Sequence, residues 1–242
     1  MRYVSQLGKI TSDLQPDRFN ISFQLTNENE FPFQIRDAVT QAINRWTSII
    51  VGDLPSIERG GQTIDDLLIN VSYEKLDEGV RAVGGFDLEN GIRSERDGLL
   101  PFRGSLSINN TEFTEGTDVA ELVGTLEHEI GHVLGFGLIW SRLGLVEGAG
   151  TRNPLFVGEK SQKVYGELLG SGPTKVPLGS DPDDRKGYDG HWNEQIFDNE
   201  LMTTRHDPGK RLSRLTIASL EDAGYEVNYE KADPFELPPQ PA

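Results

Sequence analysis

The sequence predicts an α+β fold in which a strand-bearing upper lobe ends in a long helix and an irregular lower lobe follows. Alternating apolar residues indicate short strands in the first half of the chain, and apolar residues at helical spacing indicate two long helices. After Gly135 the chain becomes rich in Gly, Pro and Asp. We therefore expect a single domain over 1–242, with the upper lobe at 1–137 and the lower lobe at 138–242.

Periodicity defines the elements of the upper lobe. Three segments have the apolar pattern of strands: 20–25, 67–73 and 104–110. Apolar residues three and four positions apart predict an amphipathic helix over about 33–50. Gly84-Gly85 and Asp97-Gly98 are typical of turns, so we expect the chain to reverse there.

A second long helix leads to the boundary between the lobes. It is expected to start near Asp118, because Glu121 stands three residues later as in a capping box. Gly135 is expected to end it in the left-handed conformation. In the lower lobe we expect short helices near 161–169 and 212–223, followed by a proline-rich tail over 234–241.

Composition excludes several classes of function. The chain has 39 acidic and 23 basic residues, and a net charge of −16 disfavours binding to a phosphate backbone. There is no cysteine, so disulfides, thiol catalysis, Cys-ligated zinc and a cysteine-based latency switch are excluded. No apolar run is long enough to span a bilayer, and the opening residues lack the apolar core of a signal peptide.

The segment His-Glu-Ile-Gly-His at 128–132 is the most informative motif. Residues four apart on a helix lie on one face, so His128 and His132 can both reach one metal ion. Glu129 stands beside the first histidine, where it can hold a water molecule. This H-E-x-x-H arrangement is typical of zinc peptidases, in which the glutamate serves as general base.

A catalytic zinc site needs a third protein ligand, and the sequence leaves more than one candidate. Only two further histidines exist, His191 and His206. A thermolysin-type site would instead use a downstream carboxylate, for which the formal candidates are Glu147, Glu159 and Glu167. Gly135 extends the motif to H-E-x-x-H-x-x-G, the start of the metzincin signature. The usual third histidine of that signature is replaced by Leu138.

The chain resembles the leishmanolysin-like branch of the metzincins, which places a long insertion before the third histidine. Three segments carry the resemblance. His191-Trp192 and Glu200-Leu201-Met202-Thr203 look like the family's H-W…E-L-M segment, and 215–228 looks like its C-terminal helix and exit. The likeness runs from about residue 118 to the end.

The resemblance implies roles for these positions. His128, His132 and His191 would ligate zinc, and Glu129 would polarise the attacking water and pass its proton to the leaving amine. Met202 would form the apolar floor of the Met-turn below the imidazoles. Thr204 stands where some metzincins carry a tyrosine, so no tyrosine acts from that position. The resemblance also favours a secreted or extracellular location.

We therefore expect a metzincin-like zincin that cleaves peptide bonds in proteins or peptides through a zinc-bound water, with monomers favoured. Its substrate would pair with an edge strand, for which 104–110 is the candidate. Two alternatives remain: a zinc-bearing binding module that no longer cleaves, and the thermolysin-type enzyme. An acidic loop before His191 is either solvated or a calcium site; its residues are Asp181, Asp183, Asp184 and Asp189.

Overall fold

The computed structural model describes residues 9–11, 17–26, 31–114, 116–180, 190–205 and 209–239. The chain divides into two compact units, Met1–Leu134 and Gly135–Ala242, which we call unit 1 and unit 2. Both helices and strands occur, so the α+β class is confirmed. None of the helices in the described ranges is long and apolar enough to cross a membrane.

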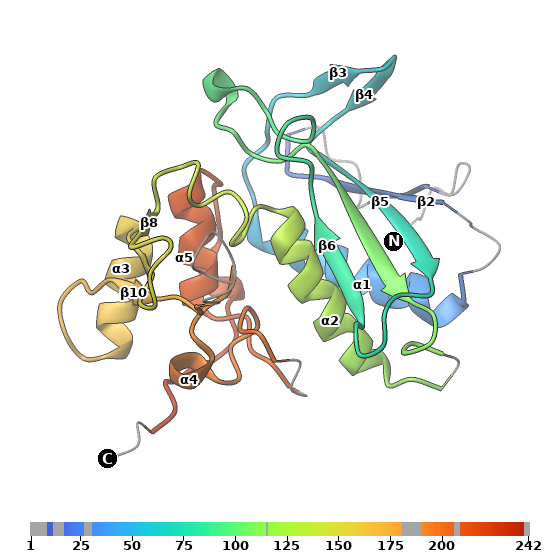
Figure 1. The fold of residues 1–242 in the computed structure, drawn as a ribbon. Helices are drawn as coiled ribbons and strands as arrows, with labels where there is room; N and C mark the ends of the chain where they lie inside the picture. The colour runs from blue at the N-terminus through green and yellow to red at the C-terminus, as the bar shows by residue number, and fades with distance from the viewer. Residues whose placement is uncertain are drawn as a thin grey trace. The chain divides into compact units, whose positions relative to one another are not determined.

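Unit 1 is built on a five-stranded sheet with the order β1-β2-β5-β7-β6 (Figure 1). β2, β5 and β7 are parallel, whereas β1 and β6 pair antiparallel to their neighbours at the two edges. The strands are β1 (Lys9–Thr11), β2 (Ile21–Leu25), β5 (Leu67–Glu74), β6 (Ala82–Gly85) and β7 (Arg103–Asn109). A separate hairpin joins β3 (Ile57–Arg59) to β4 (Gln62–Ile64), and a short 3-10 helix, η2, spans Glu95–Asp97.

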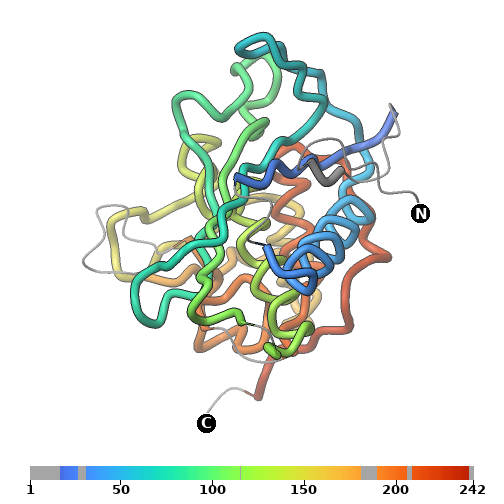
Figure 2. The backbone as a smooth tube through the Cα atoms, turned by 90° about the vertical axis from the view of Figure 1, so that its right-hand side faces the viewer, coloured from blue at the N-terminus to red at the C-terminus, as the bar shows by residue number. Residues whose placement is uncertain are grey.

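Two long helices complete unit 1, and both were predicted from the sequence. α1 (Phe33–Ile49) buries the predicted apolar stripe, and α2 (Val119–Val133) packs against α1, β6 and β7. Figure 2 shows the two helices side by side in a view turned from that of Figure 1. The buried indole of Trp46 on α1 donates a hydrogen bond of 2.9 Å to the backbone oxygen of Glu127 on α2. This contact joins the helices through a polar group that would otherwise be buried without a partner.

Two predictions about unit 1 are wrong. Gly84-Gly85 is not a turn but lies in β6. The segment 104–110 forms β7, but β7 lies between β5 and β6, so the edge strand on this side is β6. A glycine is needed at position 84 of β6 because a Cβ atom there would lie 2.3 Å from the backbone oxygen of Glu129. Gly84 therefore marks close approach of a helix rather than a chain reversal.

Unit 2 contains little regular structure, as the sequence predicts. A three-stranded sheet has the order β10-β9-β8, made from β8 (Val146–Glu147), β9 (Leu155–Phe156) and β10 (Val176–Pro177). The helices are α3 (Glu159–Leu168), α4 (Glu194–Phe197), α5 (Arg214–Ala223) and the 3-10 helix η3 (Tyr229–Lys231). Its core contains aromatic rings in edge-to-face and tilted contacts: Phe136, Trp140, Phe156, Trp192 and Phe197. Such ring contacts stabilise a core beyond the burial of their apolar area.

Candidate metal centre

The cap and exit of α2 place the H-E-x-x-H motif in the last turns of that helix. The carboxylate of Asp118 accepts a hydrogen bond of 3.0 Å from the backbone N–H of Ala120, which caps the N-terminus. The predicted reciprocal role of Glu121 is replaced by an ion pair of 2.7 Å with Arg81. Gly135 has φ 108°, so the chain leaves the helix at the predicted residue.

His128 and His132 form a buried pair of imidazoles in unit 1. Their rings meet edge to face with centroids 4.8 Å apart, and the two Nε2 atoms lie 3.1 Å from each other. Two nitrogens bound at about 2.0–2.1 Å to one tetrahedral zinc ion lie about 3.3 Å apart. The observed separation therefore fits two ligands of a single ion, and neutral imidazole is a preferred donor for zinc.

Glu129 is buried beside this pair and is held by β6. The backbone N–H of Gly84 donates a hydrogen bond of 2.6 Å to Oε2 of Glu129. Burial raises the pKa of Glu129 to about 8, while the hydrogen bond from Gly84 acts in the opposite direction. Its raised affinity for a proton suits a group that takes up a proton during the reaction. Sequence reasoning missed Gly84, because its partner lies 45 residues further along the chain.

His191 belongs to unit 2 and is held there by its backbone. Gly190, which precedes it, has φ 83°, and the His191 oxygen accepts a hydrogen bond of 2.9 Å from the N–H of Gly179. The next residue, Trp192, is fully buried, and its N–H donates to the backbone oxygen of Met202 at 3.0 Å. The segment that carries His191 is thus joined directly to the segment that carries Met202.

Met202 is fully buried, and the turn around it is fixed by Glu200. The backbone N–H of Met202 donates a hydrogen bond of 2.6 Å to Oε2 of Glu200, whose carboxylate has no exposed surface. The family resemblance includes Glu200 in the E-L-M segment but implies no role for it. Thr204, beyond the turn, is exposed and donates to Glu194.

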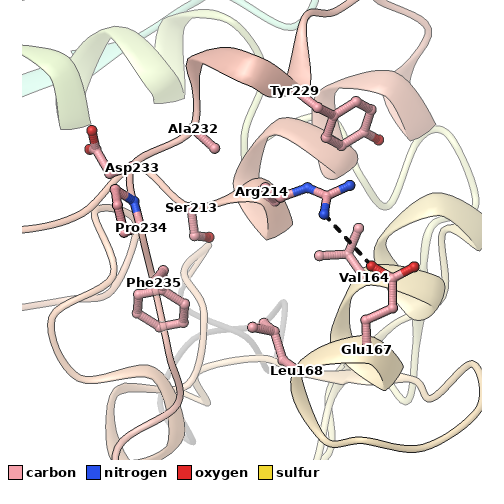
Figure 3. Close-up of a pocket in the computed structure, with 10 residues that line it drawn as sticks. All are labelled: Val164, Glu167, Leu168, Ser213, Arg214, Tyr229, Ala232, Asp233, Pro234 and Phe235. Carbon is pink, nitrogen blue, oxygen red and sulfur yellow. Dashed lines mark ion pairs between the residues drawn. The ribbon is translucent and has the colours of Figure 1, made fainter.

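Two carboxylates of the thermolysin-type alternative are exposed and paired with cations. Glu147 forms an ion pair of 2.6 Å with Lys175. Glu167 lies 3.8 Å from Arg214 at the rim of a cavity of about 430 Å³ in unit 2 (Figure 3). The Arg214 guanidinium also lies over the ring of Tyr229. These pairings leave the carboxylates in positions typical of solvated surface charges.

The other candidates either lie elsewhere or are outside the described residues. His206 and the acidic residues expected before His191 fall outside the ranges that the structure describes. In unit 1, Asp53, Asp65 and Asp66 come together. Asp66 accepts hydrogen bonds of 2.7 Å from the backbone N–H groups of Asn20 and Leu54, so it already acts as a structural acceptor.

Comparison with known sequences decides the family. A family model described as leishmanolysin matches residues 96–237, more than half of the chain. The chain belongs to the leishmanolysin family. This is a family of zinc metallopeptidases, so leishmanolysin membership and the buried histidine pair on α2 agree on the class of metal.

Curated leishmanolysin relatives match over a short stretch. The leishmanolysin-like peptidase of Caenorhabditis elegans is 48% identical over 44 residues, which is 18% of this chain and 7% of that protein. The leishmanolysin-like peptidase of Drosophila melanogaster is 44% identical over 46 residues, 19% of this chain and 7% of the fly protein. The matched stretch is thus a small part of each relative's length.

Proposed function

We propose that this chain is a zinc-dependent endopeptidase that hydrolyses peptide bonds in protein substrates. The observation that carries the proposal is the buried pair His128 and His132, with Nε2 atoms 3.1 Å apart and Glu129 beside them on α2. Family membership supports the same class of reaction. A catalytically silent zinc module would not need Glu129, so the buried carboxylate favours the enzyme.

His191 is the proposed third ligand. It supplies the same donor type as the other two, and His128, His132 and His191 are a donor set suited to a metal ion. Three imidazoles leave one position open for water and substrate, as a catalytic zinc site requires. Exposure and ion pairing of Glu147 and Glu167 favour this set over a carboxylate ligand.

The side chains would divide the reaction among them. A bound zinc ion would lower the pKa of a water molecule and polarise the scissile carbonyl. Glu129 accepts the proton as the carbonyl is attacked and delivers it to the leaving amine. The N–H of Gly84 orients the Glu129 carboxylate. Met202 is buried, and by the family resemblance it would form the apolar floor below the imidazoles.

The edge strand β6 is the proposed docking strand for the substrate. An extended peptide adds to a free sheet edge through backbone hydrogen bonds. Val83 in the middle of β6 is 54% exposed, so it can contact an incoming side chain. We assign substrate docking to 82–85 rather than to 104–110, because β7 lies between β5 and β6 and has no free edge.

Replacement of Glu129 tests the mechanism. Glu129→Ala should lower kcat on casein by about 10²–10⁴-fold, because a positioned general base contributes that much. Zinc content, measured by atomic absorption, should stay near that of the wild type. Glu121→Gln on the same helix is the matched control, since it removes only an exposed ion pair. Full proteolysis by Glu129→Ala would sink the proposed mechanism.

Two further measurements separate the alternatives. Casein digestion that persists after removal of metal with a chelator would contradict zinc catalysis, whereas a zinc-loaded protein without any digestion would indicate the silent module. His191→Ala should lose tightly bound zinc. Retention of one zinc per chain in that variant would favour the thermolysin-type site instead.

A further inference from the structure

Glu200 lies at the centre of a buried hydrogen-bond network in unit 2. Its Oε2 accepts from the backbone N–H of Met202 at 2.6 Å. Its Oε1 accepts from the backbone N–H and the hydroxyl of Ser213, at 3.2 and 2.7 Å, and from the hydroxyl of Thr216 at 2.5 Å. Ser213, Thr216 and Glu200 have at most 1% of their surface exposed.

The directions of these hydrogen bonds are fixed by the partners. Backbone N–H groups can only donate, so each carboxylate oxygen faces an obligatory donor. Thr216 Oγ1 accepts from the indole Nε1–H of Trp192 at 2.9 Å, which leaves its own hydrogen for Glu200. Ser213 Oγ likewise accepts from the backbone N–H groups of Leu215 and Thr216 at the start of α5. An acceptor with two equivalent oxygens is therefore required at position 200.

The network reaches His191 through the residue that follows it. Trp192 is held at two points: its backbone N–H donates to Met202, and its indole donates to Thr216. Both of these partners bind Glu200 directly. Trp192 thus fixes the backbone direction at His191. Trp192 is itself held by Met202 and Thr216, which both bind the Glu200 carboxylate.

We propose that Glu200 is a positioning residue for the metal centre: by binding the Met202 turn and, through Thr216, the Trp192 indole, it sets the orientation of the His191 imidazole. The proposal rests on the proposed function, in which His191 ligates zinc. A buried carboxylate is costly to desolvate, and apolar residues of similar volume usually fill such space at lower cost. A buried carboxylate can orient a metal ligand through directed hydrogen bonds, whereas apolar packing cannot.

Glu200→Gln is the sharpest test because it changes one oxygen to an amide nitrogen at constant volume. Whichever way the amide is turned, its NH₂ group faces a backbone N–H, either that of Met202 or that of Ser213. We expect zinc affinity, measured by competition with a chromogenic chelator, to fall about 10–100-fold, as is typical when the support of a ligand is lost. The visible spectrum of the cobalt-substituted protein should change, and kcat should fall more than KM changes.

Ser219→Ala is the control for simple destabilisation of α5. Ser219 is fully buried on the same helix and donates to the Thr216 backbone oxygen at 2.8 Å, outside the contacts of the Glu200 carboxylate. The Ser219→Ala variant should have a lower free energy of unfolding, but the zinc affinity and the cobalt spectrum of the wild type. If Ser219→Ala and Glu200→Gln weaken zinc binding equally, or if Glu200→Gln binds zinc within twofold of the wild type, Glu200 has no positioning role.

Thr216→Val decides the question if Glu200→Gln fails to fold. It removes the link between the Trp192 indole and the carboxylate but leaves the bonds to Met202 and Ser213 in place. A few-fold loss of zinc affinity with an altered cobalt spectrum is expected, and an unchanged site would overturn the proposal. A wild-type protein that binds no zinc, or a His191→Ala variant that binds it normally, would instead refute the ligand set of the proposed function.

Discussion

Asp66 carries a carboxylate in a position that is only 1% exposed, between the N–H groups of Asn20 and Leu54. Burial raises the pKa of Asp66 from 3.8 to about 6, although the two backbone hydrogen bonds act in the opposite direction. Desolvation of the charged form therefore outweighs the hydrogen bonds at this residue. The consequence is a pH-dependent contribution to the stability of unit 1.

The sign of that contribution follows from the raised pKa. Between pH 3.8 and 6 the unfolded chain releases the Asp66 proton while the folded chain retains it, so stability falls as the pH rises through this range. The loss is on the order of 2–3 kcal/mol and is complete above the folded pKa. Asp66→Asn cannot ionise, so the stability difference between wild type and variant should shrink by that amount from pH 4 to pH 7.

Urea unfolding of both proteins at several pH values measures this difference. A gap that stays constant or widens with rising pH would show that the Asp66 pKa is not raised. Comparison of the two proteins cancels the titration of the carboxylates that lie far from Asp66.

At the scale of elements, the packing of β6 on α2 determines how Glu129 is held. Gly84 brings its N–H within 2.6 Å of the Glu129 carboxylate, and the same close approach leaves no space for a Cβ atom. A backbone contact at this distance requires glycine on the strand side. The contact between β6 and α2 thus holds the carboxylate of the general base in place.

Gly84→Ala should disturb the contact between β6 and α2. Because the added Cβ would meet the backbone of α2, we expect a loss of about 1–3 kcal/mol in the free energy of unfolding, together with lower kcat. Gly124→Ala is the control: it adds the same methyl group to α2 where nothing lies within 4 Å. It should stabilise the protein by about 0.5–1 kcal/mol through its higher helix propensity. Equal stability of the two variants would contradict the close packing of β6 on α2.

Local periodicity predicted the elements whose patterns are long enough. α1, α2 and three of the strands follow from apolar spacing, and Gly135 ends α2 because the left-handed conformation favours glycine there. The order of the strands did not follow from apolar spacing, which does not say which strands are neighbours. In the sheet, β7 lies between β5 and β6. Gly84-Gly85 was misassigned because the sequence does not distinguish a turn from a close helix–strand contact.

For the site, too, local spacing predicted the neighbours on one helix but not the contacts between distant segments. The i, i+4 spacing on one helix is sufficient to bring His128 and His132 together, and the structure confirms this pair. The partner of Glu129 lies 45 residues away, and two of the three residues that bind Glu200 lie 13 and 16 residues away, where spacing alone carries no information. The role of His191 as third ligand stays a prediction drawn from the family resemblance.

At the scale of the whole molecule, the proposed ligand set takes His128 and His132 from unit 1 and His191 from unit 2. A metal ion that binds the folded chain and not the unfolded chain stabilises it by mass action. Zinc should therefore couple the unfolding of residues before and after Gly135. The net charge of −16 adds a general attraction for cations.

Calorimetry with buffered free zinc tests this coupling. At about 100 times the dissociation constant, zinc should add about 2.7 kcal/mol, which corresponds to a rise in Tm of roughly 5–10 °C. His191→Ala should show a much smaller rise at the same free zinc concentration. A rise as large as that of the wild type would remove His191 from the ligand set, and magnesium at equal concentration controls for general cation effects.

The short edge strand β6 also bears on how the protein behaves at high concentration. An exposed strand edge is a template on which copies of a chain can assemble into aggregates. β6 spans only four residues, and the N–H of Gly84 is already bound by a carboxylate. Accidental pairing between molecules therefore gains few hydrogen bonds at this edge. The contact that orients Glu129 thus limits what any extended segment gains at this edge, so a substrate docked on β6 also needs side-chain contacts, such as the one that exposed Val83 offers.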